Sequence, residues 1–576
     1  MGSGEVMLKG ARAGTGSLLE FRTLFYALML GFLMLVVLYP LGLLLFNSFK
    51  VQLPDGSSAL QWGNWVLAWS QTGIVQSIIN TLNRVFITEL IAFPAGVLIV
   101  WLMARTNLPG KKILDFFFWL AFFMPTVPVL MGWILLLDPQ FGLLNLWIAK
   151  LFSLQKGPFN IYSFWGIVFV HLVTRSIAAK YIFLTPAFRN LDSSLEEASR
   201  ITGVGMVGTL LRIVVPVMAP AMLITLIISL IHSLESFEIE LILGPPISFF
   251  VFSTKIYQLI YQNPPMFGAA TVLGSMILFS MIPLIFYQMY MNARQSFVTL
   301  TGHFKVNLTQ LGFGRWPVFT GVFFFAVCVT VVPLIFLLLG TFMKLYGFFG
   351  LDGAWTLSHW HEVLTDPILS GSIWNTLKLA LGAAIAGMLW YTLLAYIAVR
   401  SKFRGKGLLD FLTWLPAAIP GIILALGLLW LFLDIPLFRP LYGTIFILIL
   451  AVLLAGMTGG VQLIKSNMLQ MSQDLEEASA ISGGSWIYTL RRVVLPLLMP
   501  AILSVGILTF IGAARNVANI SILVTANNRP LSMLQLDYTV DGSYEAASIV
   551  GVITVVITVG IALLARVFGQ RFGIRT

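Results

Sequence analysis

A short acidic segment occurs twice in this chain, as SSLEEASRITGVG in the first half and as SQDLEEASAISGG in the second. Each copy places carboxylates at the start of a predicted helix, where they satisfy free backbone N–H groups and suit the helix dipole. The spacings Ser194-x-x-Glu197 and Asp474-x-x-Glu477 both fit a capping box. The chemistry that this pattern supports is the initiation of a short surface helix.

The residues that follow the carboxylates predict a smooth helix with a defined end. Alanine and serine keep one helix face small, and a glycine permits the positive φ at which helices commonly end. Prolines then redirect the chain toward the membrane. A symmetric pair of such helices requires a symmetric partner. The residues singled out for binding that partner are Glu197, Ala198, Ser199, Gly203, Pro216, Glu477, Ala478, Ser479, Gly483 and Pro496.

A second group of polar residues lies inside apolar runs. Glu235 and Glu238 occur in the first half, and Arg515 and Asn516 occur at the equivalent place in the second. Charged groups in membrane segments are costly and mark solute paths by default. Carboxylates suit a cation that prefers hard oxygen ligands, whereas mutual pairing, for instance of Glu235 with Arg515, is the structural alternative. We predict no catalytic residue and no metal site in this chain.

The elements that position these residues are predicted to be transmembrane helices. The chain has 576 residues, of which 58% are hydrophobic and 10% charged, and its mean hydropathy is +0.93. About 20 apolar residues span a bilayer. Twelve runs of that length predict an all-α polytopic membrane protein: 24–48, 80–104, 113–137, 161–185, 216–243, 267–292, 316–343, 373–399, 408–433, 441–464, 497–525 and 545–568.

Charge distribution predicts the orientation. Most of the 34 Lys and Arg residues lie beside one face if both termini are cytoplasmic, as expected when basic loops are retained inside. The net charge of +11 therefore reflects topology and does not indicate nucleic-acid binding. The lone cysteine, Cys328, excludes disulfides and a cysteine-based metal site.

The chain is a tandem repeat of two six-helix units. Asn80 and Thr81 align with Asn375 and Thr376, an offset of 375 − 80, or 295 positions; the acidic segments are 280 positions apart because the first half has an extra loop. An even number of helices orients both units the same way, as in transporters with parallel repeats. The predicted boundaries are an arm (1–22), unit one (23–292, surface helix about 193–205), a cytoplasmic linker (293–315), unit two (316–568, surface helix about 473–485) and a tail (569–576).

At this spacing the two segments resemble the Glu-Ala-Ala-x3-Gly motif of importer-type ABC transporter permeases. Each copy has serine for the second alanine, a departure that keeps the residue small. The resemblance implies two tandem type I, MetI-like permease domains in a parallel pseudo-two-fold arrangement, and it makes the surface helices coupling helices. The fused form is similar to the ferric-iron permeases.

The resemblance also implies the partners. A homodimeric cytoplasmic ABC ATPase would dock on the coupling helices, and a periplasmic or extracellular binding protein would deliver the solute to this bacterial inner-membrane protein. ATP and Mg²⁺ belong to the ATPase, since the chain has no Gly-x4-Gly-Lys-Ser/Thr motif, so no cofactor or enzymatic activity is expected here. Ferric iron is the leading cargo, with a polyamine, 2-aminoethylphosphonate, thiamine or sulfate as alternatives; an ion-coupled secondary transporter is the alternative of another class.

Overall fold

The computed structural model describes residues 4–52, 57–71, 73–294 and 308–571 and is almost entirely helical. The helices of the first half are α1 (Gly4–Phe49), α2 (Gly63–Ser70), α3 (Ile74–Arg105), α4 (Lys111–Phe123), α5 (Thr126–Leu137), α6 (Leu143–Leu151), α7 (Phe164–His171), α8 (Ile177–Arg189), α9 (Ser193–Ile201), α10 (Met206–Thr209), α11 (Val215–Leu234), α12 (Glu238–Leu243), α13 (Phe252–Tyr261) and α14 (Phe267–Arg294). A two-stranded antiparallel hairpin, β1 (Lys50–Gln52) and β2 (Ser58–Leu60), pairs Val51 with Ala59.

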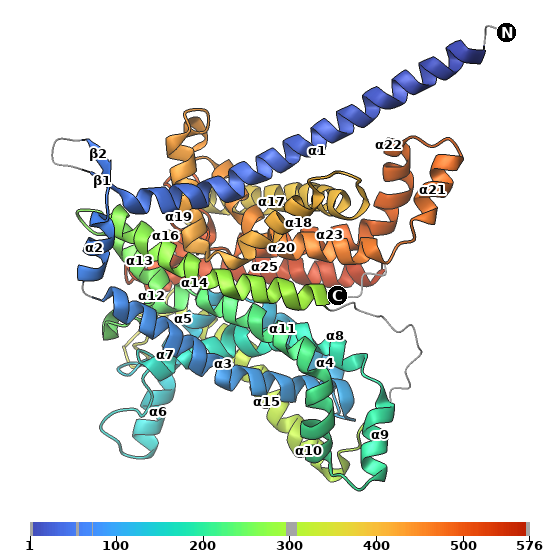
Figure 1. Cartoon of the computed structure of the whole chain (residues 1–576). Helices are drawn as coiled ribbons and strands as arrows, with labels where there is room; N and C mark the ends of the chain where they lie inside the picture. The colour runs from blue at the N-terminus through green and yellow to red at the C-terminus, as the bar shows by residue number, and fades with distance from the viewer. Residues whose placement is uncertain (1–3, 53–56, 72, 295–307, 572–576) are drawn as a thin grey trace.

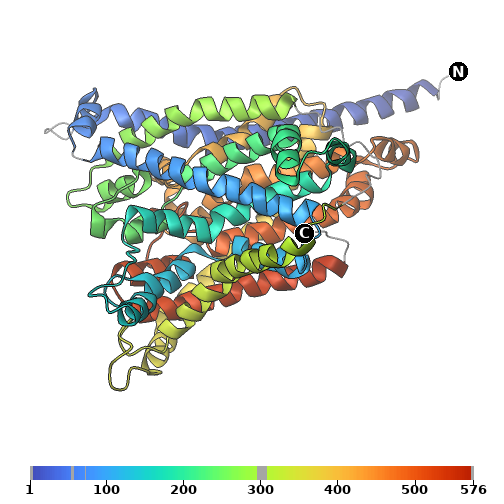
Figure 2. The same ribbon diagram turned by 90° about the horizontal axis from the view of Figure 1, so that it is seen from below.

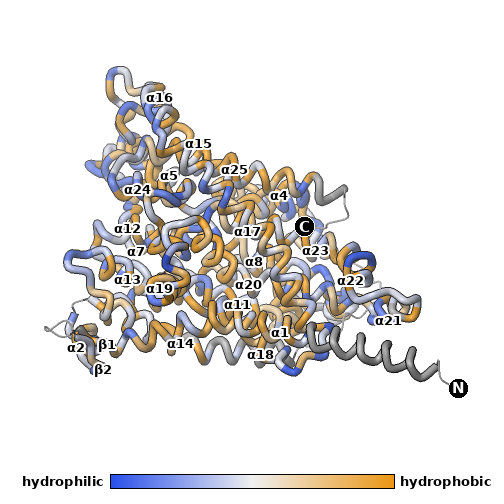
Figure 3. The backbone as a smooth tube through the Cα atoms, turned by 90° about the horizontal axis from the view of Figure 1, so that it is seen from above, coloured by the Kyte–Doolittle hydropathy of each residue, from blue (hydrophilic) through white to orange (hydrophobic). Residues whose placement is uncertain are grey.

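The second half has a similar order with fewer helices. Its helices are α15 (Arg315–Gly340), α16 (Ser358–Thr365), α17 (Pro367–Arg400), α18 (Lys406–Trp414), α19 (Gly421–Asp434), α20 (Ile445–Leu469), α21 (Asp474–Ile481), α22 (Trp486–Thr489), α23 (Leu495–Ala514), α24 (Leu531–Val540) and α25 (Tyr544–Arg571). Apolar residues dominate the middle of the bundle in Figure 3, whereas hydrophilic segments gather toward its two ends. Such a distribution suits a bundle surrounded by lipid.

Nine helices of the described residues are long and apolar enough to span a membrane, and eleven do so if each of two bent helix pairs counts as one span. The first bent pair is α4 with α5, at 103°. The second is α18, extended by a 3₁₀ turn over Leu415–Ala418, with α19, at 116°. A further predicted run corresponds to α14, whose apolar part 267–280 is shorter. The prediction of a polytopic all-α protein is therefore confirmed.

Four of the predicted runs differ from single straight helices. Runs 113–137 and 408–433 break before Pro125 and Pro420 because the residue before a proline is driven out of the α region; Met124 has ψ 139° and Ile419 has ψ 115°. Runs 216–243 and 497–525 are shorter than predicted, since α11 ends at Leu234 and α23 at Ala514. Beyond those ends the chain forms α12 and a series of turns.

The first helix of each half packs against the other half. Figure 1 shows α1 lying along the second half, while α15 runs with the first; α1 contacts α18 and α19, and α15 contacts α4 and α5. Glycine allows the close approach in both places. A Cβ on Gly132 would lie 2.0 Å from the Pro333 carbonyl oxygen, and one on Gly427 would lie 3.0 Å from Pro40 Cβ. The two sequence units are therefore interlocked.

The short helices α9 and α21 project from one end of the bundle, on the right in Figure 1. Figure 2, turned by 90°, shows the long helices running between this end and the opposite one, which carries the β1–β2 hairpin. The predicted linker falls largely on 295–307, and the predicted tail partly on 572–576; both stretches lie outside the described residues. Both surface helices thus occupy one end of the molecule.

Candidate functional site

Both predicted surface helices are present, and a side chain two positions earlier than predicted caps each one. Asp192 Oδ1 accepts a hydrogen bond from the Ser194 N–H at 3.0 Å, and Ser472 Oγ accepts one from the Asp474 N–H at 3.2 Å. The prediction that Ser194 and Asp474 are the caps is wrong. Short polar side chains readily accept a hydrogen bond from the backbone N–H two residues later. Asp192 and Ser472 therefore occupy the N–H groups at the starts of α9 and α21.

A glutamate adjacent to the predicted one ties each surface helix to the bundle. Arg105, the last residue of α3, contacts Glu196 at 2.8 Å and 3.2 Å through two nitrogens, and it also donates to the Leu191 carbonyl. In the second half, Arg400 Nε lies 2.9 Å from Glu476 Oε1. Sequence reasoning missed Glu196 and Glu476. The sequence did contain a signal for these contacts, because Arg105 and Arg400 align with each other at the 295-residue offset between the repeats.

The serines that replace alanine in the motif also have a structural role. Ser199 Oγ lies 2.8 Å from Thr209 Oγ1, and Ser479 Oγ lies 2.8 Å from Thr489 Oγ1. Each hydroxyl pair joins the surface helix to the short helix after it. One such hydrogen bond contributes about 0.5–1.5 kcal/mol, so the substitution braces the segment while keeping the side chain small.

The glycine that ends each surface helix is required by backbone conformation. Gly203 has φ +78° and Gly483 has φ +81°, and a Cβ at either would meet nothing within 4 Å. The Val204 N–H bonds the Ser199 carbonyl at 3.1 Å, which is the six-to-one closure of a Schellman motif. The glycines therefore shape the helix end, and the space around them is open.

We expect Gly203→Ala to destabilise the α9 segment by about 1–2 kcal/mol, because an L side chain is strained at positive φ. Gly203→Asn is expected to cost less, since asparagine tolerates that region. Gly205→Ala is the matched control, because Gly205 has φ −66° and open space around it. Hydrogen exchange over 193–204 measures the effect. Equal protection in the Gly203→Ala and Gly205→Ala variants would contradict the conformational explanation.

The outer faces of the two surface helices are exposed and partly apolar. Ala198 and Ala478 are exposed, and so are Ile201 and Ile481, at 87% and 88%. Glu197 is half-buried and Glu477 is exposed. Pro216 and Pro496 lie at the second residue of α11 and α23, each directly after a π-helical turn, at Leu210–Val214 and Leu490–Val494, that continues into the helix. The exposed alanine and isoleucine of each helix therefore form two similar surfaces at one end of the bundle, whereas Ser199, which was predicted to bind the partner, is buried.

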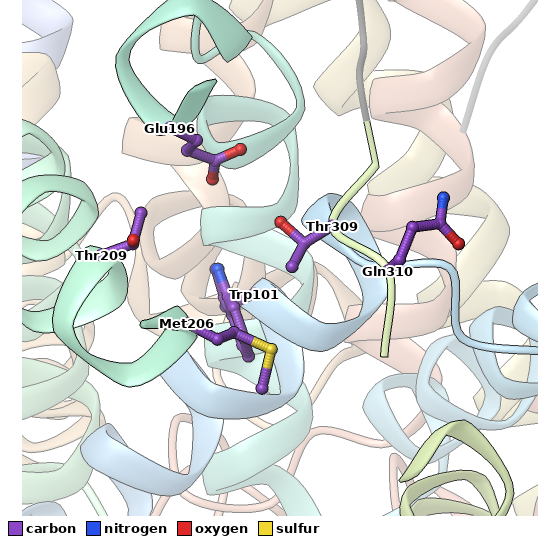
Figure 4. A pocket seen from close by; sticks show the side chains of 6 residues that line it. All are labelled: Trp101, Glu196, Met206, Thr209, Thr309 and Gln310. Carbon is purple, nitrogen blue, oxygen red and sulfur yellow. The ribbon is translucent and has the colours of Figure 1, made fainter. Parts of the chain in front are cut away.

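A cavity of about 310 Å³ lies beside α9 (Figure 4). The last part of the linker is bound there and makes the surroundings of the two surface helices unequal: the Thr309 N–H donates to the Arg105 carbonyl at 2.8 Å, and the Asn107 N–H donates to the Thr309 carbonyl. Glu196 is 1% exposed, whereas Glu476 is 20% exposed. The cavity is lined by Trp101, Glu196, Met206, Thr209, Thr309 and Gln310.

Of the predicted path residues, Arg515 makes a contact between the two halves. Arg515 donates to the carbonyls of Phe122 and Met124, at 2.9 Å and 3.3 Å, at the break between α4 and α5. Glu238, at the start of α12, interacts electrostatically with Arg515. Glu235 pairs with His232 at 3.2 Å instead of with Arg515. The half-buried Asn516 accepts a hydrogen bond from the Asn519 N–H at 3.2 Å.

Two buried ionic clusters in the first half were not predicted. Arg84 Nε and His171 Nε2 each lie 2.9 Å from Glu240 Oε1, and the Ser236 hydroxyl donates to the same carboxylate at 2.6 Å. Lys180 pairs with Glu89 at 2.8 Å. The signal was the repeat itself, because the second half carries apolar or small residues at the aligned positions of Arg84, Glu89, His171, Lys180 and Glu240, namely Leu379, Ala384, Ala451, Gly460 and Ile520.

Side-chain volume compensates for this difference between the halves. A Cβ on Gly96 would lie 2.5 Å from Lys180 Cβ, so a glycine makes room for the lysine in the first half. At the aligned place in the second half, Tyr391 fills the space left by Gly460, and its hydroxyl donates to the Leu453 carbonyl at 2.6 Å. This part of the second half therefore packs without charge, and among the described residues the two buried ionic clusters occur in the first half.

Comparison with protein families gives two matches along the chain. The family model described as "Binding-protein-dependent transport system inner membrane component" matches residues 93–297 and 391–574. Each match includes one surface helix, with its glutamate, and the arginine that contacts this glutamate.

Individual relatives extend the comparison. "Ferric transport system permease protein FbpB" of Actinobacillus pleuropneumoniae is 31% identical over 70% of this chain, and the match spans 58% of the relative's length. "Probable ABC transporter permease protein y4fN" of Sinorhizobium fredii is 25% identical over 95% of this chain and 94% of its own. A crystal structure of a bacterial ABC transporter involved in alginate import covers 47% of this chain and 94% of the matched chain, with 22% identity and a TM-score of 0.39.

Proposed function

The chain belongs to the family of binding-protein-dependent transport system inner membrane components, and we propose that it is a transmembrane permease of an ATP-driven importer. It is a multi-pass membrane protein, and the family match occurs once in each half. The proposed activity is the translocation of one solute, delivered by a binding protein outside the membrane. ATP hydrolysis is assigned to a separate subunit that holds ATP and Mg²⁺.

The observation that carries the proposal is the matched pair of surface helices, α9 and α21. Both are anchored by an arginine–glutamate contact, braced by a serine–threonine pair and ended by a positive-φ glycine. Both leave an alanine and an isoleucine exposed at the same end of the bundle. Exposed apolar residues in a polar setting mark interaction sites, and two equivalent sites suit a homodimeric ATPase.

The orientation that we propose places α9, α21 and both termini in the cytoplasm. Arg105, Lys111, Lys112, Arg400 and Lys406 all lie at the ends of helices near the surface helices, and basic residues near membrane helices are retained inside. An ATPase docked there has access to cytoplasmic ATP. The opposite end, with the β1–β2 hairpin and α16, then receives the external binding protein.

The anchoring contacts give the mechanism a physical route. A force on α9 is transmitted to α3 through Arg105 and Glu196, and a force on α21 reaches α17 through Arg400 and Glu476. Closure of the ATPase dimer would draw the two surface helices together and rock one bundle against the other. Because α1 and α15 are exchanged between halves, the rocking motion includes the first helix of the opposite unit.

Ferric iron is the cargo that we propose, on the basis of the relative named as a ferric transport permease. The path runs between the halves, past Glu235, Glu238, Arg515 and Asn516. A polyamine, 2-aminoethylphosphonate, thiamine or sulfate is the alternative cargo of the same machine. The separate binding protein performs most of the selection.

The proposal predicts that the chain recruits an ATPase subunit and stimulates it when a loaded binding protein docks. We expect ATPase activity of the reconstituted complex to rise several-fold with Fe³⁺-loaded binding protein, and to stay at its basal level with polyamine-loaded or phosphonate-loaded protein. Stimulation by a binding protein loaded with another solute would replace ferric iron as the proposed cargo and leave the proposed importer unchanged. A chain that recruits no ATPase and transports under an ion gradient would instead be a secondary transporter.

A further inference from the structure

Arg175 is an exposed arginine near the middle of a membrane span. The span Phe164–Arg189 consists of α7, a π-helical turn over Leu172–Ser176 and α8, and Arg175 lies on the π turn. A charged side chain at membrane depth is costly unless it pairs or lines a water-filled cavity. The Arg175 side chain is exposed on the surface of the chain, so the groups around it decide what it faces.

The groups around Arg175 come from both halves of the chain. Its guanidinium stacks on the Phe122 ring, 5.5 Å from the ring centre, and the Phe122 carbonyl accepts a hydrogen bond from Arg515. Glu235 and Glu238 act on Arg175 electrostatically. Arg175 therefore lies beside Phe122, whose backbone is contacted by Arg515 of the second half, next to the proposed solute path.

The guanidinium of Arg175 has no hydrogen bond or ion pair with any residue that the structure describes. The nearby Glu235 is paired with His232, and the two bonds of Arg515 go to backbone carbonyls. An arginine presents five N–H donors in a planar fork, so this site offers unused hydrogen-bond donors.

Neither Arg175 nor the π turn is required by the architecture. The aligned residue in the second half is Ala455, and α20 is an uninterrupted α-helix over Ile445–Leu469. Isolated π turns in helices are frequent at functional sites because they re-aim a side chain. The second half packs the same span without either feature, so both are additions specific to the first half.

We propose that Arg175 binds an oxyanion, such as a carboxylate, phosphate or sulfate group, in the translocation path. This inference rests on the proposed function and specifies the class of cargo: a solute that is itself an oxyanion, or a metal ion that crosses with one bound. Arg175 forms bidentate hydrogen bonds with the oxygens of such a group.

Direct binding tests the inference without the ATPase. The full-length chain in phosphatidylcholine nanodiscs is dialysed to equilibrium against ³²P-labelled inorganic phosphate and, separately, ³⁵S-labelled sulfate. We expect saturable binding of at least one anion, a loss of at least tenfold in affinity for Arg175→Ala, and a several-fold loss for Arg175→Lys, which keeps the charge but not the fork. Arg189→Ala is the matched control, because Arg189 is an exposed arginine on the same helical segment with only a 3.7 Å contact to Asp115.

Each other outcome overturns the inference. If the wild-type chain binds neither anion, or if Arg175→Ala binds them as tightly as the wild type does, Arg175 is not an oxyanion-binding residue. Competition by phosphatidylglycerol in the nanodisc would show that a lipid headgroup is the ligand and not a cargo anion. Failure of ATPase recruitment would overturn the proposed importer but leave this binding measurement unaffected, so the two failures are distinguishable.

Discussion

Replacement of Glu196 by alanine is expected to abolish transport, because it leaves Arg105 charged and without its carboxylate partner. The Arg105 and Glu196 side chains are 0% and 1% exposed. Removing one partner of such a buried ion pair costs about 3–5 kcal/mol. The remaining bond of Arg105, to the Leu191 carbonyl, holds the chain before α9 but not the helix itself. We expect α9 to lose its fixed position relative to α3.

The measurements are ATPase co-purification, uptake in proteoliposomes and hydrogen exchange over 193–204. Glu476→Ala is the matched variant in the second half, where Arg400 and Glu476 are 5% and 20% exposed. Water screens that contact better, so its loss is expected to have a smaller effect. Equal uptake by wild type and Glu196→Ala, with normal exchange in α9, would show that the arginine–glutamate contact does not transmit force.

Replacement of Glu240 by isoleucine is expected to have the largest effect on stability. Arg84 is 0% exposed and would lose its only acidic partner within 4 Å among the described residues, at a cost of about 3–5 kcal/mol. The double variant Arg84→Leu with Glu240→Ile copies the second half, which has Leu379 and Ile520 at the aligned positions. Because it leaves no unpaired charge, the double variant is expected to recover most of the lost stability.

Thermal unfolding in detergent and size-exclusion profiles measure the stability, and uptake measures the function. A folded but inactive double variant would assign the ionic cluster to transport. Tolerance of the single Glu240→Ile change, or a double variant less stable than the single one, would contradict the packing argument.

The sequence predicted the elements of this protein well and their contacts poorly. The twelve apolar runs and the repeat follow from local composition and spacing, and each run corresponds to a helix or a bent pair of helices. The bends between α4 and α5 and between α18 and α19 follow from Pro125 and Pro420. They were not predicted because each apolar run was long enough to be interpreted as one straight helix. The exchange of α1 and α15 had no local signal, because it depends on which helices meet in the folded chain.

The same distinction applies to the candidate sites. The sequence by itself determined where the two surface helices lie and that glycine ends them, since helix initiation and termination depend on residues a few positions apart. Only the tertiary structure decided that Glu196 rather than Glu197 meets Arg105, that Arg515 binds the broken end of α4, and that Arg175 is exposed on Phe122 without an ion pair to any described residue. Neighbouring glutamates differ by about 100° around a helix, and which one is buried depends on a residue 91 positions away.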